Sequence, residues 1–294
     1  MSFDNAYEGL TAEHDDARWA YGSGFHDEMS TVDREIPSTV DRADLAAYAL
    51  MLGDDALILS QRTAEWCSNG PELEEDVALA NIALDLLGQA RLLLTRAGEV
   101  EGAGRDEDRL AYFRDEIDFR NVRLVEQDNG DFAQTIARLL LFSSARLALF
   151  VRLSASADPV LAAVAAKGVK ELAYHRDHAA QWTVRLGDGT EESHRRMQAG
   201  LDRVWPYLEE LFTAHPVEQR LAAAGVAVDP GELRAEVDAV LDQVLTAATL
   251  TRPDVAPMAT VSGRAGRDGV HSRPMGYLLA ELQHIARSQP DAVW

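Results

Sequence analysis

The most suggestive chemistry in this sequence lies in one short segment, KELAYHRDHAAQW, which spans residues 170–182. A helix would bring four of its side chains onto one stripe, because they are spaced by four, three and four residues. These side chains are Glu171, His175, His178 and Trp182. Carboxylate and imidazole groups on one inward stripe are the ligands from which di-iron sites in helical bundles are built. The segment therefore raises the question of a metal site.

The wider ligand pattern of a di-iron site is incomplete in this chain. Such a bundle needs a Glu on each of two helices and a Glu-x-x-His pair on each of the other two. Three residues before His175 stands Leu172, where the pattern requires a Glu. In the segment ALDLLGQAR the comparable carboxylate is Asp85, and three residues later comes Gly88, which has no side chain. We therefore predict no metal site here and interpret Glu171 and His175 as an i,i+4 pair or a buried polar pair that fixes packing.

The alternative hypothesis is an independent metal-binding oxidase that uses the stripe itself. A single metal could be held by His175, His178 and a carboxylate, with Glu171 and Asp85 as available donors. This hypothesis predicts tightly bound metal and activity from the isolated chain. We do not expect Cys67 to act as a nucleophile, because a lone cysteine is more often a small apolar filler.

A second candidate is the loop 263–273, which concentrates positive charge in an acidic chain through Arg264, Arg267 and Arg273. Guanidinium groups bind phosphates and carboxylates through paired hydrogen bonds. The loop could therefore hold an anion, such as the phosphates of a CoA group, or an acidic surface of a partner. The alternative is a flexible loop with solvated arginines, and the sequence does not decide between the two.

The composition excludes several classes of partner and site. Of 294 residues, 28 are Lys or Arg and 49 are Asp or Glu, which gives a net charge of −21. So negative a chain repels phosphate backbones and anionic lipid headgroups, and we expect neither nucleic acid nor a membrane as a partner. With a single cysteine, the chain can hold no internal disulfide and no Cys-based zinc or iron–sulfur site.

The N-terminal sequence, MSFDNAYEGLTAEHDDARW, is acidic and lacks the apolar segment of a signal peptide. Apolar stretches elsewhere are interrupted by Arg, Asp or Gln before the roughly 20 residues that a membrane span needs. We therefore expect a cytoplasmic protein.

Beyond residue 37, the chain reads as helices rich in Ala and Leu. Long helices are predicted over about 38–67, capped by Ser38 or Thr39, and over 71–98, 131–156 and 158–186. A charged, solvated helical stretch is expected within the longer connection, over about 105–127. A further helix is predicted to begin at the cap Thr190 and to kink at Pro206, and others are predicted near 216–224, 230–251 and 274–288.

Four long helices with one extended crossover predict an all-α fold, a ferritin-like four-helix bundle with additional C-terminal helices. We assign residues 38–294 to this helical domain. Residues 1–37 are polar and carry no sustained apolar period, which predicts a mobile or partner-dependent extension.

Several long segments resemble one known family. They include ELEEDVALANIALDLLGQARLLL, GRDEDRLAYFRDEIDFRN, VEQDNGDFAQTIARLLLF, KELAYHRDHAAQWTVRLGDGTEESHRRMQ and GYLLAELQHIARSQPDAVW. These are similar to the C subunits of ring 1,2-phenylacetyl-CoA epoxidase, also called phenylacetate-CoA oxygenase. The resemblance covers about residues 40–294 and leaves residues 1–37 outside it.

The resemblance implies a specific role. The family's complex epoxidises the aromatic ring of phenylacetyl-CoA during aerobic phenylacetate breakdown. The di-iron centre lies in its A subunit, and its C subunit is a ferritin-like relative without that centre that pairs with A as a structural partner. A small B subunit and a reductase with flavin and an iron–sulfur cluster complete the system. No cofactor and no catalytic residue is therefore expected in this chain.

Overall fold

The computed structural model describes residues 28–290 and residue 292, and within them all regular structure is helical apart from an isolated bridge between Val261 and Arg264. The long helices are α1 (Arg42–Ala64), α2 (Leu73–Glu101), α4 (Phe132–Leu153) and α5 (Pro159–Gly187). The shorter ones are α3 (Glu107–Tyr112), α6 (Glu191–Val204), α7 (Pro216–Ala223), α8 (Arg234–Ala247) and α9 (Arg273–Ser288). The predicted all-α fold is confirmed.

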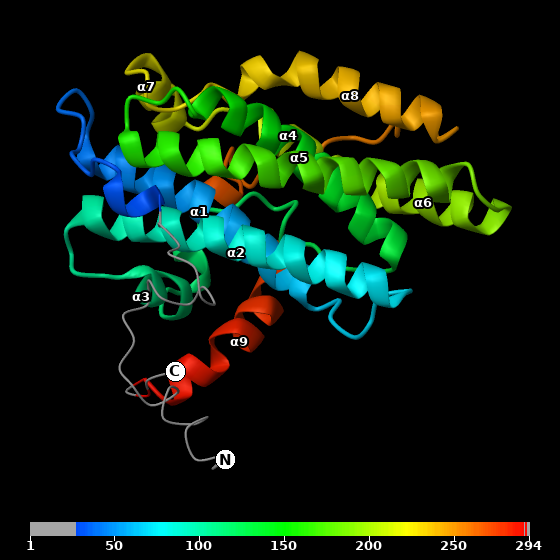
Figure 1. Ribbon diagram of the computed structural model, residues 1–294, viewed down its shortest axis with the longest axis horizontal. Helices are drawn as coiled ribbons and strands as arrows, with labels where there is room; N and C mark the ends of the chain where they lie inside the picture. The colour runs from blue at the N-terminus through cyan, green and yellow to red at the C-terminus, as the bar shows by residue number, and fades with distance from the viewer. Residues whose placement is uncertain (1–27, 291, 293–294) are drawn as a thin grey trace, which may run out of the picture.

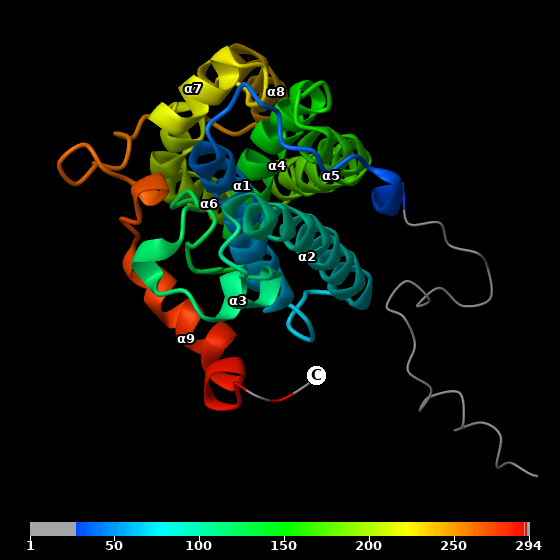
Figure 2. The ribbon, with the colours of Figure 1, turned by 90° about the vertical axis from the view of Figure 1, so that its left-hand side faces the viewer.

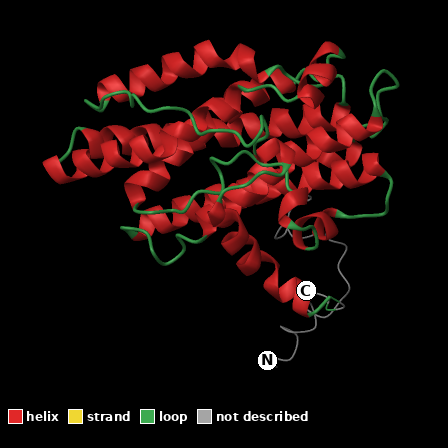
Figure 3. Cartoon of the chain, turned by 180° about the vertical axis from the view of Figure 1, so that it is seen from behind, coloured by secondary structure: helices red, strands yellow, loops and turns green. Residues whose placement is uncertain are grey.

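The long helices form a ferritin-like bundle in which α1 pairs with α2, α4 pairs with α5, and α2 meets α5 (Figure 1). The additional helices surround this bundle. Helix α6 packs on α4, α8 lies over α4 and α5, and α7 lies on α1. Helix α9 projects from the bundle beside α3 (Figure 2), and the view from behind shows helices linked by loops (Figure 3).

Helix ends follow the capping residues in the sequence, with one correction. Helix α1 begins after Asp41, whose carboxylate accepts hydrogen bonds from the backbone of Ala43 and Asp44. The predicted cap at Ser38 or Thr39 was therefore wrong by two or three residues. A carboxylate binds the free N–H groups of a first turn well and also opposes the positive end of the helix dipole.

The predicted kink at Pro206 appears as a change of helix type. Helix α6 ends at Val204, and residues Trp205–Phe212 continue as a 3-10 helix. A proline removes one backbone donor and crowds the preceding turn, which favours such a change.

The charged crossover departs most from the sequence prediction. Only α3 and the single turn Glu116–Asp118 are helical within it. Residues 115–118 are exposed as expected, but the expectation of a solvated stretch fails farther along, because Phe119, Val122 and Glu126 are completely buried. Buried acids of α1 explain this path, since Asp54 accepts a hydrogen bond of 2.8 Å from the backbone N–H of Arg120. A helix would use that N–H internally, whereas an extended segment offers it to the carboxylate.

The described part of the predicted N-terminal extension lies against the bundle. The buried guanidinium of Arg96 donates to the carbonyl oxygens of Arg34 and Glu35, at 2.9 and 3.3 Å, and pairs with Asp158. Met29 is buried as well. The remainder of the extension, residues 1–27, lies outside the described residues.

Helix α2 combines a membrane-like composition with a place in the bundle. Among the described residues it is the one helix that is long and apolar enough to cross a membrane. Its inner side packs along α1, and core helices of globular proteins share this composition. The absence of a membrane partner therefore stays a prediction.

Candidate functional site

Glu171, His175 and His178 on α5 face α2 and form a row of contacts across the interface between these two helices. At one end, the amide of Gln89 donates a hydrogen bond of 3.0 Å to the carboxylate of Glu171. Burial raises the pKa of Glu171 above its usual value. The sequence interpretation of Glu171 and His175 as an i,i+4 pair is therefore corrected, because Glu171 reaches across to α2.

The central contact of the row joins His175 to Asp85, whose Nε2 and Oδ2 atoms lie 3.0 Å apart. The imidazole is buried, whereas the carboxylate side chain keeps 36% of its surface exposed. Leu172 is completely buried in the apolar core one turn away. Gly88 leaves open space, since a Cβ atom there would meet nothing within 4 Å.

The third contact brings His178 to 3.2 Å from a carboxylate oxygen of Glu75. Burial lowers the pKa of His178, so its imidazole is neutral at pH 7. Both side chains border an open groove of about 660 Å³ that is lined by residues of α2, α5 and α8.

These contacts do not form a metal-ligand set. Glu171, His175 and His178 each face a different residue of α2 instead of converging on one point. The described part of the chain contains no group of three or more His, Cys, Asp or Glu side chains that could hold a metal ion. A di-iron centre does not fit, because buried Leu172 and Gly88 stand where carboxylate and imidazole donors are required. The row of contacts serves instead to hold α2 and α5 together.

The arginine loop is a structural anchor at Arg267. Its guanidinium makes two hydrogen bonds, of 3.0 and 2.8 Å, to the buried carboxylate of Asp55 on α1. It also donates to the carbonyl oxygens of Met51 and Arg120. Although burial opposes the charge, Asp55 holds the pKa of Arg267 above its usual value. The sequence left open whether Arg267 binds an anion, and the structure directs both of its terminal nitrogens to acceptors inside the protein.

The other two arginines of the loop are exposed and point to local partners. Arg264 donates to the carbonyl oxygen of Asp268, and Arg273 contacts the hydroxyl and ring of Tyr277. Each of the three arginines binds a different partner, so the loop does not gather them into one anion site.

Cys67 is exposed, and its interpretation as an apolar filler was wrong.

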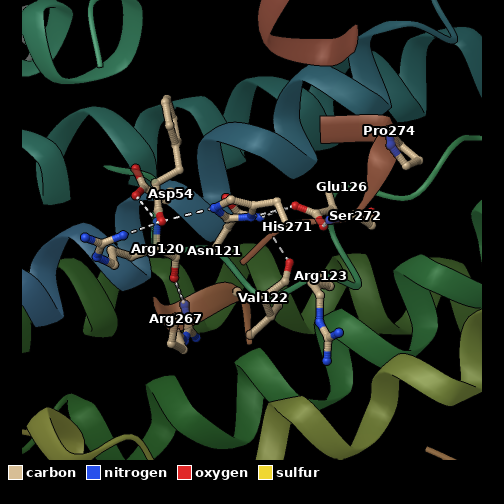
Figure 4. A network of polar contacts seen from close by, with 12 residues as sticks. Asp54, Arg120, Asn121, Val122, Arg123, Glu126, Arg267, His271, Ser272 and Pro274 are labelled. Carbon is tan, nitrogen blue, oxygen red and sulfur yellow. Dashed lines mark hydrogen bonds and ion pairs between the residues drawn. The ribbon is translucent and has the colours of Figure 1, made fainter. Parts of the chain in front are cut away.

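A buried network around Glu126 fastens the same loop to the crossover (Figure 4). The carboxylate of Glu126 lies 2.9 Å from Nδ1 of His271 and accepts a hydrogen bond of 2.6 Å from the backbone of Ser272. The other imidazole nitrogen lies 3.2 Å from the carbonyl oxygen of Phe119. Although burial opposes protonation, the hydrogen bond with Glu126 raises the pKa of His271. Two acceptors around one imidazole favour its charged form.

Sequence reasoning missed these buried charges. The signal was present in Asp54 and Asp55, which stand in the middle of the apolar helix α1. Asp54 forms an ion pair with Arg114 of the crossover, and Asp55 pairs with Arg267. Adjacent acids in a core helix indicate partners elsewhere in the chain, because an unpaired buried carboxylate is costly.

Comparisons with known proteins agree with the resemblance described above. Residues 27–294 match a family model named PaaA_PaaC and described as phenylacetic acid catabolic protein. The chain is also 47% identical over 250 residues to the C subunit of the 1,2-phenylacetyl-CoA epoxidase of Escherichia coli (strain K12). This alignment covers 85% of the chain and 99% of that relative. The chain therefore belongs to the phenylacetic acid catabolic protein family and is related to its epoxidase C subunits.

Proposed function

We propose that this chain is the non-catalytic structural subunit of a phenylacetyl-CoA epoxidase complex and pairs with the di-iron A subunit. Its similarity to an epoxidase C subunit over most of the chain supports membership of such a complex. The helical bundle supports a role in presenting long, preformed helices to a partner, because packed helices offer a rigid surface.

The observation that carries the non-catalytic role is the contact between His175 and Asp85. At this level of the bundle, a di-iron protein needs two Glu-x-x-His pairs on facing helices. Here an imidazole and a carboxylate from α5 and α2 bind each other at 3.0 Å. The two remaining positions hold Leu172 and Gly88, which cannot bind metal. The polar groups that remain at this level thus stabilise the bundle.

The proposal includes the rest of the system that the resemblance implies. The di-iron centre belongs to the A subunit, and flavin and the iron–sulfur cluster belong to the reductase. The complex also includes a small B subunit, and we place it in the cytoplasm. This chain itself is proposed to carry no cofactor.

The proposal is tested by reconstitution. Purified A and B subunits and reductase are assayed for oxygen-dependent conversion of phenylacetyl-CoA, with and without this chain, and binding to the A subunit is measured by light scattering. We expect a stable complex and loss of activity when the chain is omitted. A chain that neither binds the A subunit nor changes turnover would contradict the proposed function.

A further inference from the structure

The segment that precedes the described part of the chain, residues 1–27, is rich in aromatic side chains. Five of its 27 residues are aromatic, namely Phe3, Tyr7, Trp19, Tyr21 and Phe25. Aromatic residues make up only 7% of the whole chain. Segments that remain solvated carry few aromatic residues, because these side chains favour burial. The composition therefore indicates that residues 1–27 bind an apolar surface, and the matched family model starts only at residue 27.

An apolar surface of α2 is open to such a segment. Leu84 and Leu87 keep 63% and 43% of their surface exposed, and no part of the described chain covers them. They lie three residues apart, which places them on one side of the helix. On α5, Tyr174 is 49% exposed, and its ring lies 6.3 and 6.0 Å from the rings of His175 and His178. Because these histidines face α2, Tyr174 borders the boundary between the two helices.

Positive charge lies beside this apolar surface. Lys167 and Lys170 are the two lysines of the sequence, and both are exposed on α5. Lys167 stands one turn before Glu171, whose carboxylate accepts a hydrogen bond of 3.0 Å from Gln89 of α2. An apolar surface beside two lysines fits an occupant that is both apolar and acidic. We call the following residues the α2–α5 face: Leu84, Leu87, Lys167, Lys170 and Tyr174.

The described chain begins next to this face. The 3-10 turn η4 (Glu28–Thr31) contacts α5, and the side chain of Met29 within it is buried (Figure 2). Arg96 of α2 holds the backbone just beyond, at residues 34–35. Residues 1–27 are thus tethered at the boundary between α2 and α5. An extended chain spans about 3.3 Å per residue and α2 is about 44 Å long, so the segment can reach any part of the α2–α5 face.

We propose that residues 1–27 fold back over the α2–α5 face and cover it in the isolated chain. Their aromatic side chains pack on Leu84 and Leu87, and their acids lie against Lys167 and Lys170. The segment can supply this charge, because it holds six acidic residues and one arginine. The cover is independent of the proposed function, and a partner that uses the same face has to displace it.

The charges of α2 itself restrict where the cover lies. Exposed Glu72 and Glu74 stand where the helix begins. Like charges repel, so an acidic segment avoids this end of α2. Leu84 and Leu87 lie nearly three turns farther along, on the part of α2 that is closer to η4 and to the two lysines.

A second copy of this chain is the competing occupant, and the tether disfavours it. Each copy carries a net charge of −21, so two copies repel each other. A segment joined directly to the face that it covers has an effective concentration of about 1 mM, well above that of a protein at micromolar concentration. Residues 1–27 of the same chain therefore occupy the face before a second copy does.

The test uses photochemical cross-linking in the full-length chain. A benzophenone amino acid replaces Leu84, and in a matched control it replaces Val151 on α4, which is 51% exposed. Both positions lie on the surface, so each variant is expected to fold, and circular dichroism checks this. After irradiation at micromolar protein concentration, electrophoresis separates monomer from dimer and mass spectrometry identifies the joined residues. The same label at Leu87 repeats the measurement.

We expect a product of monomer mass in which position 84 is joined to residues 1–27, with a yield about fivefold or more above that from position 151. Lys167→Gln combined with Lys170→Gln should lower this yield by about threefold or more at low salt, because the acids of the segment lose their partners. A product of dimer mass would assign the face to a second copy and overturn the proposal. Equal yields from positions 84 and 151, or cross-links from 84 and 87 that miss residues 1–27, would overturn it as well.

Discussion

Nε2 of His175 lies 3.0 Å from Oδ2 of Asp85, and this contact joins α5 to α2 in the middle of the bundle. The imidazole is buried and the carboxylate reaches the surface. The contact uses Nε2 of the imidazole and one carboxylate oxygen, and it links the two helices from within the protein. The same residue types that could serve catalysis here serve packing.

Replacing His175 tests whether its role is structural. His175→Ala removes the contact with Asp85 and leaves a small cavity, so we expect the free energy of unfolding to fall by about 2 kcal/mol. Well below the melting temperature, the reconstituted complex should turn over at an unchanged rate. Urea unfolding and steady-state assays measure the two effects. A variant that assembles normally but has lost turnover would contradict the structural role.

Arg267 is expected to act on stability and not on ligand affinity. Arg267→Ala leaves the buried carboxylate of Asp55 without its main partner, which we expect to cost about 3 kcal/mol. Exposed Arg264→Ala is the control and should change stability by less than about 0.5 kcal/mol. Urea unfolding compares the stability of the two variants. Titration with CoA measures binding, and we expect neither substitution to lower the affinity for CoA. CoA binding that either substitution weakens would revive the loop as an anion site.

The ion pair between Glu126 and His271 makes stability depend on pH in a defined direction. The folded protein holds the pKa of His271 above the unfolded value of about 6.5. The stability that the ion pair contributes is therefore complete below about pH 6.5, and it is lost as the pH rises through the pKa of His271 in the folded protein. We expect the stability lost in His271→Ala to be larger at pH 6 than at pH 9, by urea unfolding.

The control for this pH effect is His284→Ala, because His284 is an exposed histidine on the neighbouring helix α9. It should show no comparable pH-dependent loss. Glu126→Gln should remove most of the pH dependence by withdrawing the carboxylate that favours the charged imidazole. Equal losses for His271→Ala at both pH values would show that folding does not raise the pKa of His271.

Two glycines of α2 should respond in opposite ways to alanine. A Cβ atom at Gly88 would meet open space, so Gly88→Ala should stabilise the isolated chain by about 0.5–1 kcal/mol through helix propensity. A Cβ atom at Gly98 would collide with the carbonyl oxygen of Arg105, and Gly98→Ala should destabilise it. Thermal unfolding measures both changes. A destabilising Gly88→Ala would mean that a group not seen here fills that space.

The sequence predicted the long helices well because their signals are local. Asp158 and Pro159 begin α5 as expected, with the carboxylate accepting from the backbone of Leu161, and Thr190 caps α6 through Ser193. Caps and helical apolar periods require only a few neighbouring residues. The absence of donors at Leu172 and Gly88 was equally visible.

The contacts across the bundle could not be predicted in this way. The pairing of Asp55 with Arg267 joins residues more than 200 positions apart, and that of Glu126 with His271 joins residues more than 140 apart. In the sequence, Arg267, Glu126 and His271 resemble solvated surface residues, and the adjacent acids of α1 do not show which residues pair with them. The crossover was assigned to a solvated helix for this reason, since the buried carboxylates that direct its path lie on a different element.

Iron content distinguishes a chain that supports a catalyst from one that holds the metal itself. It is measured on the isolated full-length chain after anaerobic loading with ferrous iron and desalting. We expect near-zero iron per chain, because Leu172 and Gly88 stand where two metal ligands are required. About two tightly bound irons per chain, the content of a di-iron site, would contradict it.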